Sequence, residues 1–342
     1  KTFTPDLPGD YSGGGVNIRT VSIPDEPFVK ASFSREHNRR FTGKDGFVTY
    51  DGSGVGTWGR HRGARSMPRG AEDMEKDGLT DTGLPSLHDE PAQDGNDHDK
   101  KYLEYDRITR AMAPAMGTKR TKVPPGHGYS LSAGGNKDLG GGWKLGGMAA
   151  LTYSRKYSLR TAEETSLKKP PETNPGDTNE YFYTRDTGKE QVKWSMLGTV
   201  GLAKGEDHTF SLTAARNRAA TDQASIKLEQ VDEQETISDQ EQAIHYTERA
   251  VNVLQMRTTH KWDSLFTDNI DFELDLYGAH NLAEQEEPDV RSFKNVVERV
   301  GEDMYKLYPD DKQSGAETRT TRIWRNTRED NSQYGLNLTF PF

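Results

Sequence analysis

Two stretches of the sequence bring together residue types that could hold a cofactor or a metal ion. Residues 54–59 read Gly-Val-Gly-Thr-Trp-Gly and match the dinucleotide pattern G-x-G-x-x-G. That site needs a buried strand before it and an apolar helix after it, whereas residues 60–62 read Arg-His-Arg. Residues 94–99 gather oxygen ligands, but Asp99 occupies the sixth position, where a calcium-binding EF-hand needs glycine. We therefore predict two external loops, with opportunistic cation binding as the alternative for the second, and expect no cofactor and no resident metal.

Basic side chains gather beside Trp58 in the same part of the chain. They are Arg60, His61, Arg62, Arg65 and Arg69. Guanidinium groups bind phosphates and other anions through paired hydrogen bonds. Trp58, Arg60, Arg62 and Arg65 are therefore candidate contacts for an anionic ligand or for the phosphates of lipopolysaccharide, and a solvated charged loop is the alternative interpretation.

Catalysis and nucleic-acid binding have little support in the composition. The nine histidines form no local grouping of nucleophile, base and orienting residue. The absence of cysteine removes disulfides, thiol catalysis and cysteine-based zinc sites. A net charge of −9 argues against a nucleic-acid partner, which would require a basic face. We expect a protein that is not an enzyme.

The hydropathy of the chain restricts its fold class. Hydrophobic residues make up only 31% of the sequence, yet 14 Tyr, 12 Phe and 5 Trp are more than a disordered chain normally carries. No stretch approaches the ~20 apolar residues of a transmembrane helix. A strand of a transmembrane β-barrel needs only ~9–11 residues with every second one apolar, which is compatible with a polar average.

Alternation with a period of two recurs along the chain and predicts about eight antiparallel strands, each apolar on one face and small or polar on the other. Residues 143–153 alternate for longer than an ordinary globular strand of ~5–6 residues. The alternating stretches are 29–34, 129–133, 143–153, 192–202, 210–214, 244 to about 257, 270–278 and 334–342.

The predicted connections between these strands fall into two kinds. Short ones occur near 139–142, 203–208 and 263–269, and long ones rich in Gly, Pro and charge cover about 37–126, 160–189, 220–241 and 281–331. Short turns on one side and long extracellular loops on the other are typical of bacterial outer-membrane barrels. A soluble β-sandwich is the alternative, and the strand length argues against it. Apolar residues from Tyr102 to Met112 have helical spacing and predict a short amphipathic helix within the first long loop.

The start of the chain resembles the end of the plug domain of a TonB-dependent receptor. In that family a pair of glycines precedes a short Val-x-Ile strand that leads into the barrel, and the matching residues here are Gly13, Gly14, Gly15, Val16 and Ile18. Glycines allow tight backbone approach at such a junction. Residues 47–52, 246–249, 287–291 and 324–342 resemble further family segments and follow the family's order. The resemblance thus divides the chain into 1–24, the end of a plug, and 25–342, the first part of a barrel.

The resemblance implies a function as well as a fold. Members of the family take up a scarce ligand across the outer membrane, powered by the TonB-ExbB-ExbD system, and are surrounded by outer-membrane lipid and lipopolysaccharide. Their barrels have about 22 strands, and Lys1 to Pro5 lack the apolar part of a signal peptide, so we expect a portion of a longer protein. Two other functions stay open: an outer-membrane scaffold whose loops bind a surface lipoprotein or envelope subunit, and a soluble β-sandwich binding module.

Overall fold

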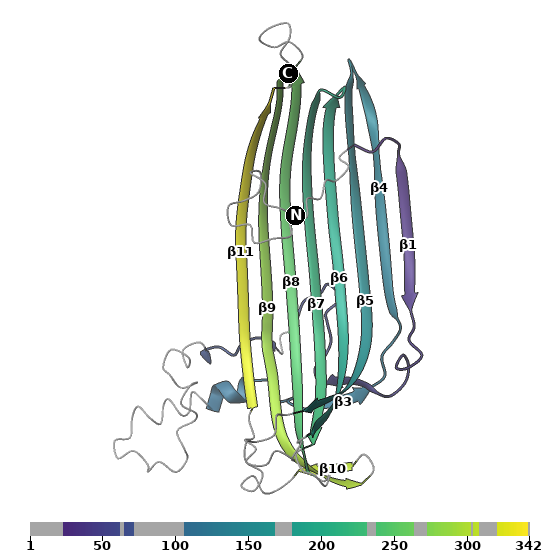
Figure 1. The fold of residues 1–342 in the computed structure, drawn as a ribbon. Helices are drawn as coiled ribbons and strands as arrows, with labels where there is room; N and C mark the ends of the chain where they lie inside the picture. Colours follow the sequence, from purple (N-terminus) through teal and green to yellow (C-terminus); the bar gives the residue numbers. More distant parts are fainter. Residues whose placement is uncertain are drawn as a thin grey trace, which may run out of the picture.

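The computed structural model describes residues 23–61, 65–71, 106–167, 180–230, 237–262, 272–301, 304–307 and 320–340, and they are almost entirely antiparallel β-structure. The predicted all-β antiparallel fold is therefore confirmed (Figure 1). The strands are β1 (Phe28–Glu36), β2 (Phe47–Tyr50), β3 (Thr118–Thr121), β4 (Gly126–Gly140), β5 (Trp143–Leu167), β6 (Glu180–Lys204), β7 (His208–Gln230), β8 (Ile237–Trp262), β9 (Phe272–Gly301), β10 (Met304–Leu307) and β11 (Thr320–Thr339).

One large sheet contains all but two of these strands. Its neighbours follow the order β1, β4, β5, β6, β7, β8, β9, with both β10 and β11 pairing with β9. Except for the step from β1 to β4, each long strand up to β9 pairs with the next one along the chain. The strands β2 and β3 form a separate two-stranded sheet. The described strands therefore provide no large second sheet that could form a β-sandwich with the first.

Tight turns join several long strands at one end of the sheet. Between β4 and β5, Gly140, Gly141 and Gly142 have φ values of 84°, 61° and 80°, and Gly205 after β6 has a φ of 56°. Side chains rarely tolerate this left-handed region, so glycine is the residue that lets the chain reverse so quickly. These turns lie where the sequence predicts short connections.

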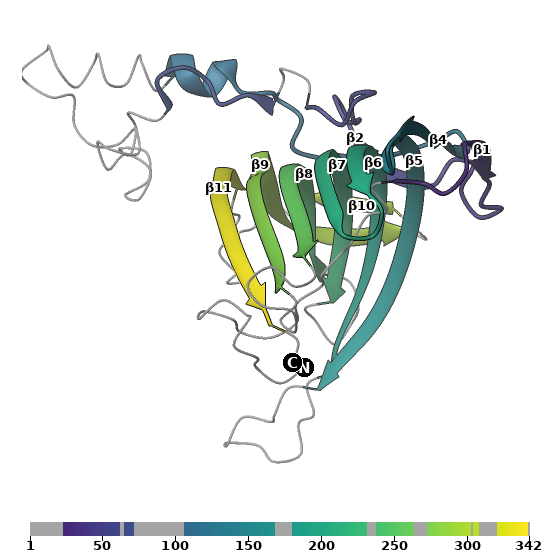
Figure 2. The same ribbon diagram turned by 90° about the horizontal axis from the view of Figure 1, so that it is seen from above.

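The two faces of the sheet differ in chemistry. Seen from above, the sheet curves into an arc (Figure 2). Alternate residues point to its convex side and form a patch that we call the apolar band, whose large side chains are exposed. Exposed members of this band include Leu131, Leu145, Leu151, Met196, Val200, Phe210, Leu212, Leu254, Met256, Leu336 and Leu338. The residues between them point to the concave side and are mostly small or polar, with cross-strand ion pairs such as Arg257–Asp275.

Aromatic rings border the apolar band at both ends. Near the short turns, the ring centroid of Phe272 lies 5.4 Å from that of Trp262 and 5.4 Å from that of Phe340. At the other end, Tyr153 lies opposite both Tyr129 and Trp194 in the register.

The strands extend well beyond the band, which corrects three predicted loops. Most described residues within 160–189, 220–241 and 281–331 belong to strands, as the register pairs Arg160–Thr187, Gln223–His245 and Glu284–Arg328 show. The predicted loop boundaries were wrong because other parts of the chain cover the convex face there. Charged and apolar residues alternate irregularly under this cover, which hides the period of two.

The connection from β1 to β4 carries that cover. Residues 41–61, which we call the covering segment, and β3 lie against the convex side of the sheet (Figure 2). Residues 106–111 are helical and Ile108 is fully buried, which confirms the described part of the predicted helix. The predicted plug end with Gly13 to Ile18, and the acidic residues 94–99, lie outside the described residues. In the described ranges, no helix has the length and apolarity needed to cross a bilayer.

Candidate functional site

Among the described residues, clusters of buried apolar side chains lie between the covering segment and the convex face. Val48 and Tyr50 of β2 form one buried cluster with Ala224 of β7 and Ile244 of β8. A second cluster joins Val55 to Val192, Ala220 and Tyr246. These strand residues lie on the same face of the sheet as the apolar band, so the band continues beneath the covering segment. The small alanine side chains let the backbone of the covering segment approach the sheet.

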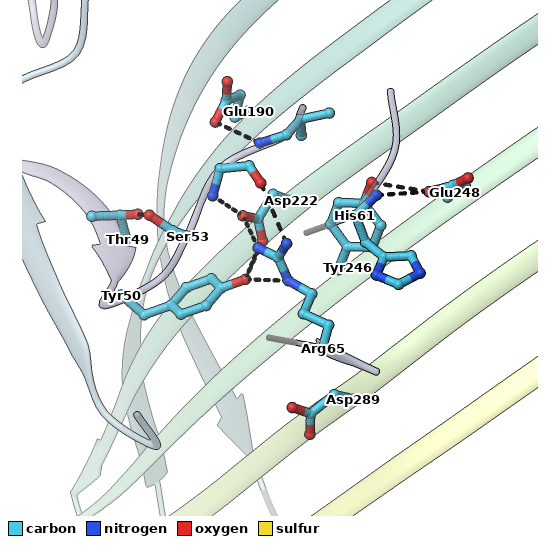
Figure 3. A network of polar contacts seen from close by, with 12 residues as sticks. Thr49, Tyr50, Ser53, His61, Arg65, Glu190, Asp222, Tyr246, Glu248 and Asp289 are labelled. Atoms are coloured by element: carbon cyan, nitrogen blue, oxygen red, sulfur yellow. Dashed lines mark hydrogen bonds and ion pairs between the residues drawn. The ribbon is translucent and has the colours of Figure 1, made fainter. Parts of the chain in front are cut away.

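A buried ion pair lies at the centre of this contact (Figure 3). Arg65 Nη2 is 2.7 Å from Asp222 Oδ2, and the two side chains are only 2% and 3% exposed. The Tyr50 hydroxyl accepts a hydrogen bond from Arg65 Nε at 3.0 Å and donates one to Asp222 Oδ1 at 2.7 Å. The Arg65 guanidinium also lies 4.5 Å from the ring centroid of Tyr246. We call Tyr50, Arg65 and Asp222 the latch, because they join the covering segment and the residues that follow it to β7.

The protonation states of the latch follow from its burial. Desolvation raises the pKa of Tyr50 well above its usual value, and the negative charge of Asp222 adds to this effect. Burial alone would lower the pKa of Arg65, but Asp222 and Tyr50 outweigh it and the net pKa is raised. At neutral pH the phenol therefore keeps its proton for the hydrogen bond to Asp222, and the guanidinium stays charged.

Three carboxylates of neighbouring strands hold the covering segment by its backbone. Glu190 of β6, Asp222 of β7 and Glu248 of β8 accept the N–H groups of Val55 at 3.4 Å, Gly54 at 2.6 Å and His61 at 3.0 Å, respectively. Each carboxylate also contacts an arginine, in the same order Arg155, Arg65 and Arg218. We call these three acids the carboxylate row. Charged acceptors make stronger hydrogen bonds than neutral ones, so the row fixes the position of the segment on the sheet.

Glu190 shows the electrostatic cost of this arrangement. Burial raises its pKa, and the charge of Asp222, directly opposite in the register, raises it further. Arg155 Nε, 3.1 Å from Glu190 Oε1, and the N–H of Val55 act in the opposite direction. Burial also raises the pKa of Tyr157, whose hydroxyl donates to Glu190 Oε1 at 3.3 Å, to about 12.

Another buried acid, Asp289, lies in β9 where the register with β8 is interrupted. Its φ of 59° is the only positive value among the described residues other than glycine. Asp289 is 2% exposed and accepts hydrogen bonds from Arg291 Nε at 3.0 Å and from Arg322 Nε at 2.7 Å. The Arg291 guanidinium lies 5.8 Å from the ring centroid of Tyr50. Asp289 and its arginines therefore lie next to the latch.

The glycine motif at 54–59 forms part of the same contact. Gly59 N donates to Gly56 O at 2.9 Å, Gly56 N donates to Arg60 O at 3.1 Å, and a Cβ on Gly56 would lie 2.7 Å from Arg60 O. The N–H of Gly54 is bound to Asp222. The motif thus makes a compact turn against the sheet, and these N–H groups are not free to bind a phosphate.

The candidate contact residues for an anionic ligand differ in their exposure to solvent. Trp58 is 56% exposed, Arg60 is exposed, and Arg62 lies outside the described residues. Arg65 is buried and its contacts are internal, so as placed it does not face an external ligand.

The carboxylate row was not predicted from the sequence. Asp222 falls within a stretch predicted as a loop, and Glu190 follows another such stretch. A signal was nevertheless present, because Ala220-x-Asp222-x-Ala224 and Tyr246-x-Glu248-x-Ala250 place an acid in the phase of otherwise apolar positions. An acid in that phase is expected to be buried and paired.

The arrangement is suited to holding the chain in place. A cavity of about 170 Å³ between β2 and the sheet, lined by Tyr50, Glu190 and Asp222 among others, is smaller than the ~300–1,000 Å³ of typical small-molecule sites. No protein-family model, curated protein or solved structure matches this chain, so its function has to be argued from this geometry and from the sequence.

Proposed function

We propose that the large sheet is part of the wall of a bacterial outer-membrane β-barrel and that the protein is a TonB-dependent receptor that takes up a scarce ligand. The observation that carries the proposal is the exposed apolar band on a single face of the sheet. Monomeric soluble proteins rarely expose continuous apolar patches of this extent. Lipid would cover the band in a membrane.

The dimensions of the band support a membrane location. On β5 it runs from Trp143 to Tyr153, and on β6 from Lys204 to Trp194. Ten residue steps of about 3.3 Å at a tilt of about 40° give a height of roughly 25 Å, the usual thickness of the apolar belt of such barrels. The aromatic rings at both ends match the girdles that lie at membrane interfaces. The polar concave face would then line the lumen.

Energised transport rests on the family resemblance. It implies that TonB-ExbB-ExbD drives uptake, with the predicted plug end at 1–24 leading into the barrel. The carboxylate row lies beyond the band on the side away from the short turns, which in this proposal is the extracellular side.

A scaffold function is the second candidate, and one observation favours it. The covering segment is held on the convex side, away from the proposed lumen, and Trp58 is exposed on it. A surface fixed in this way faces neighbouring molecules at the outer surface of the membrane, as binding of a surface lipoprotein or envelope subunit would require.

Cysteine labelling is expected to separate the two faces of the sheet. The sequence contains no cysteine, so single substitutions give unique labels. In outer membranes that contain the protein, Leu151→Cys and Leu212→Cys should react with a lipid-soluble maleimide and resist a water-soluble one. The adjacent concave-face variants Ala150→Cys and Ser211→Cys should show the reverse preference, because strand neighbours point to opposite faces. Equal reaction of all four variants with the water-soluble reagent would rule out the proposed wall.

Uptake should depend on both this protein and TonB. We expect cells that lack the gene to lose uptake of at least one member of a labelled panel of metal chelates, glycans, peptides and cobalamins. Cells that lack TonB should lose the same member, and the double deletion should add no further loss. A scaffold predicts a different result, namely normal uptake by cells that lack the gene.

A further inference from the structure

Trp58 of the covering segment lies at the edge of the apolar band. The ring centroid of Trp58 is 6.3 Å from those of Tyr153 and Trp194, with both pairs close to edge-on. Trp194 Nε1 donates to the backbone oxygen of Trp58 at 2.8 Å. On the same face of β6, Met196 and Val200 are 44% and 43% exposed. Trp58 therefore extends the aromatic edge directly above exposed aliphatic side chains.

Three arginines lie beside these rings. The Arg216 guanidinium is 5.9 Å from the ring centroid of Trp194. Gly59 packs against Arg218, since a Cβ on Gly59 would lie 3.5 Å from Arg218 Cγ, and Arg60 follows directly. The charges of Arg60 and Arg216 both act on Arg218. Positive charge is thus concentrated at one point on the edge of the band.

Nearby acids balance only part of this charge. Glu248 pairs with Arg218 and also receives the N–H of His61 and the hydroxyl of Tyr246. Glu286 lies 3.8 Å from His61 Nε2, and its charge also acts on Arg218. Among the described residues, the structure gives no ion pair to Arg60 or Arg216, and both are exposed.

We propose that Trp58, Arg60, Trp194 and Arg216 form a binding site on the outer wall for the phosphate group of a membrane lipid. The site rests on the proposed membrane location. Arginine binds phosphate through two parallel hydrogen bonds, and tryptophan favours the interface between headgroups and acyl chains. The phosphate would contact Arg60 and Arg216, while the acyl chains lie along Met196 and Val200. The occupant is therefore an anionic lipid, for which phosphorylated lipid A is the test molecule.

Binding can be measured on the full-length protein in an uncharged detergent by native mass spectrometry. We expect bisphosphorylated lipid A to bind, and its dephosphorylated form to bind at least about tenfold more weakly, because charge-assisted hydrogen bonds are lost. The double variant Arg60→Gln/Arg216→Gln should weaken binding of the phosphorylated lipid by a similar factor. The matched control Arg35→Gln/Arg249→Gln removes two other exposed arginines and should bind like the unchanged protein.

Three results would overturn the site. They are unchanged affinity in the Arg60/Arg216 double variant, equal binding of the two lipid A forms, and displacement of the lipid by inorganic phosphate at concentrations as low as those of the lipid. Thermal melting of the double variant should match the control, which shows that lost binding is not lost folding. The outcome is distinct from that of the uptake experiment, since a protein that binds lipid without transporting a ligand would contradict only the proposed transport.

Discussion

Replacing Asp222 by alanine is expected to detach the covering segment from the sheet. The change leaves the Arg65 guanidinium buried without its counter-charge, and it removes the acceptor for Gly54 N–H and for the Tyr50 hydroxyl. Removing one partner of a buried ion pair usually destabilises a protein by about 3–5 kcal/mol. The continuous strand pairing does not depend on Asp222, so the loss should be local. Hydrogen exchange of residues 47–61 should accelerate by roughly a hundredfold or more, while β5 and β6 keep their protection near the short turns.

Two controls make this result specific to the latch. Asp51→Ala removes an ion pair to Lys119 in the same part of the chain, but that pair is largely exposed and its loss should have little effect. The double variant Arg65→Met/Asp222→Leu replaces both charges by apolar groups, and it should be less destabilised than Asp222→Ala alone. If Asp222→Ala exchanges as slowly as Asp51→Ala, the latch does not hold the segment.

Gly188→Ala is expected to displace β2 from the sheet. A Cβ at Gly188 would collide with the carbonyl oxygen of Val48 and would lie 2.9 Å from its carbonyl carbon and 3.1 Å from its nitrogen. These atoms belong to the backbone of β2, which cannot move aside as a flexible side chain could. Overpacking a core typically destabilises the folded protein by about 1–3 kcal/mol. Because the Cβ at position 188 would collide with backbone atoms, we expect a destabilisation at or above the upper end of that range. The measurement is again hydrogen exchange, now of residues 47–50, with the melting temperature recorded in parallel.

Gly198→Ala is the matched control for this substitution. Gly198 lies on the same strand and the same face, and a Cβ there would meet no atom within 4 Å. Replacing glycine by alanine within a strand generally stabilises it slightly when the space is free. We therefore expect opposite signs at the two positions. Similar stability changes for both variants would mean that close approach of β2 is not the reason for glycine at 188.

The sequence predicted the apolar band well because its exposed side chains leave a simple pattern. From Trp143 to Tyr153, no described residue outside the sheet covers the large convex-face side chains apart from neighbouring rings, so every second residue is apolar or small. The turn glycines at 140–142 and 205 were likewise visible, because their backbone conformation leaves few other residue types. The presence of these strands, and which face of each is apolar, could therefore be predicted from neighbouring residues in the sequence.

The carboxylate row could not be read in the same way, since it depends on contacts distant in the sequence. Asp222 meets Arg65 across 157 positions, and His61 meets Glu248 across 187. In isolation, an acid after a run of alanines indicates the end of a strand, and the neighbouring charges indicate a loop. Only the covering segment makes those positions interior, and its own sequence, rich in glycine, gives no sign of the surface on which it lies.

The order of strands also has a consequence for how the chain folds. From β4 to β8, each strand pairs with its successor, so these ladders can form hairpin by hairpin through short loops. The β1–β4 ladder instead has to close a connection running from residue 37 to residue 125. The entropy of closing so long a loop exceeds that of a tight turn by roughly 3 kcal/mol. Docking of residues 47–61 on β6, β7 and β8 shortens the free part of that connection, so the residues that fix the covering segment would also speed the late addition of β1.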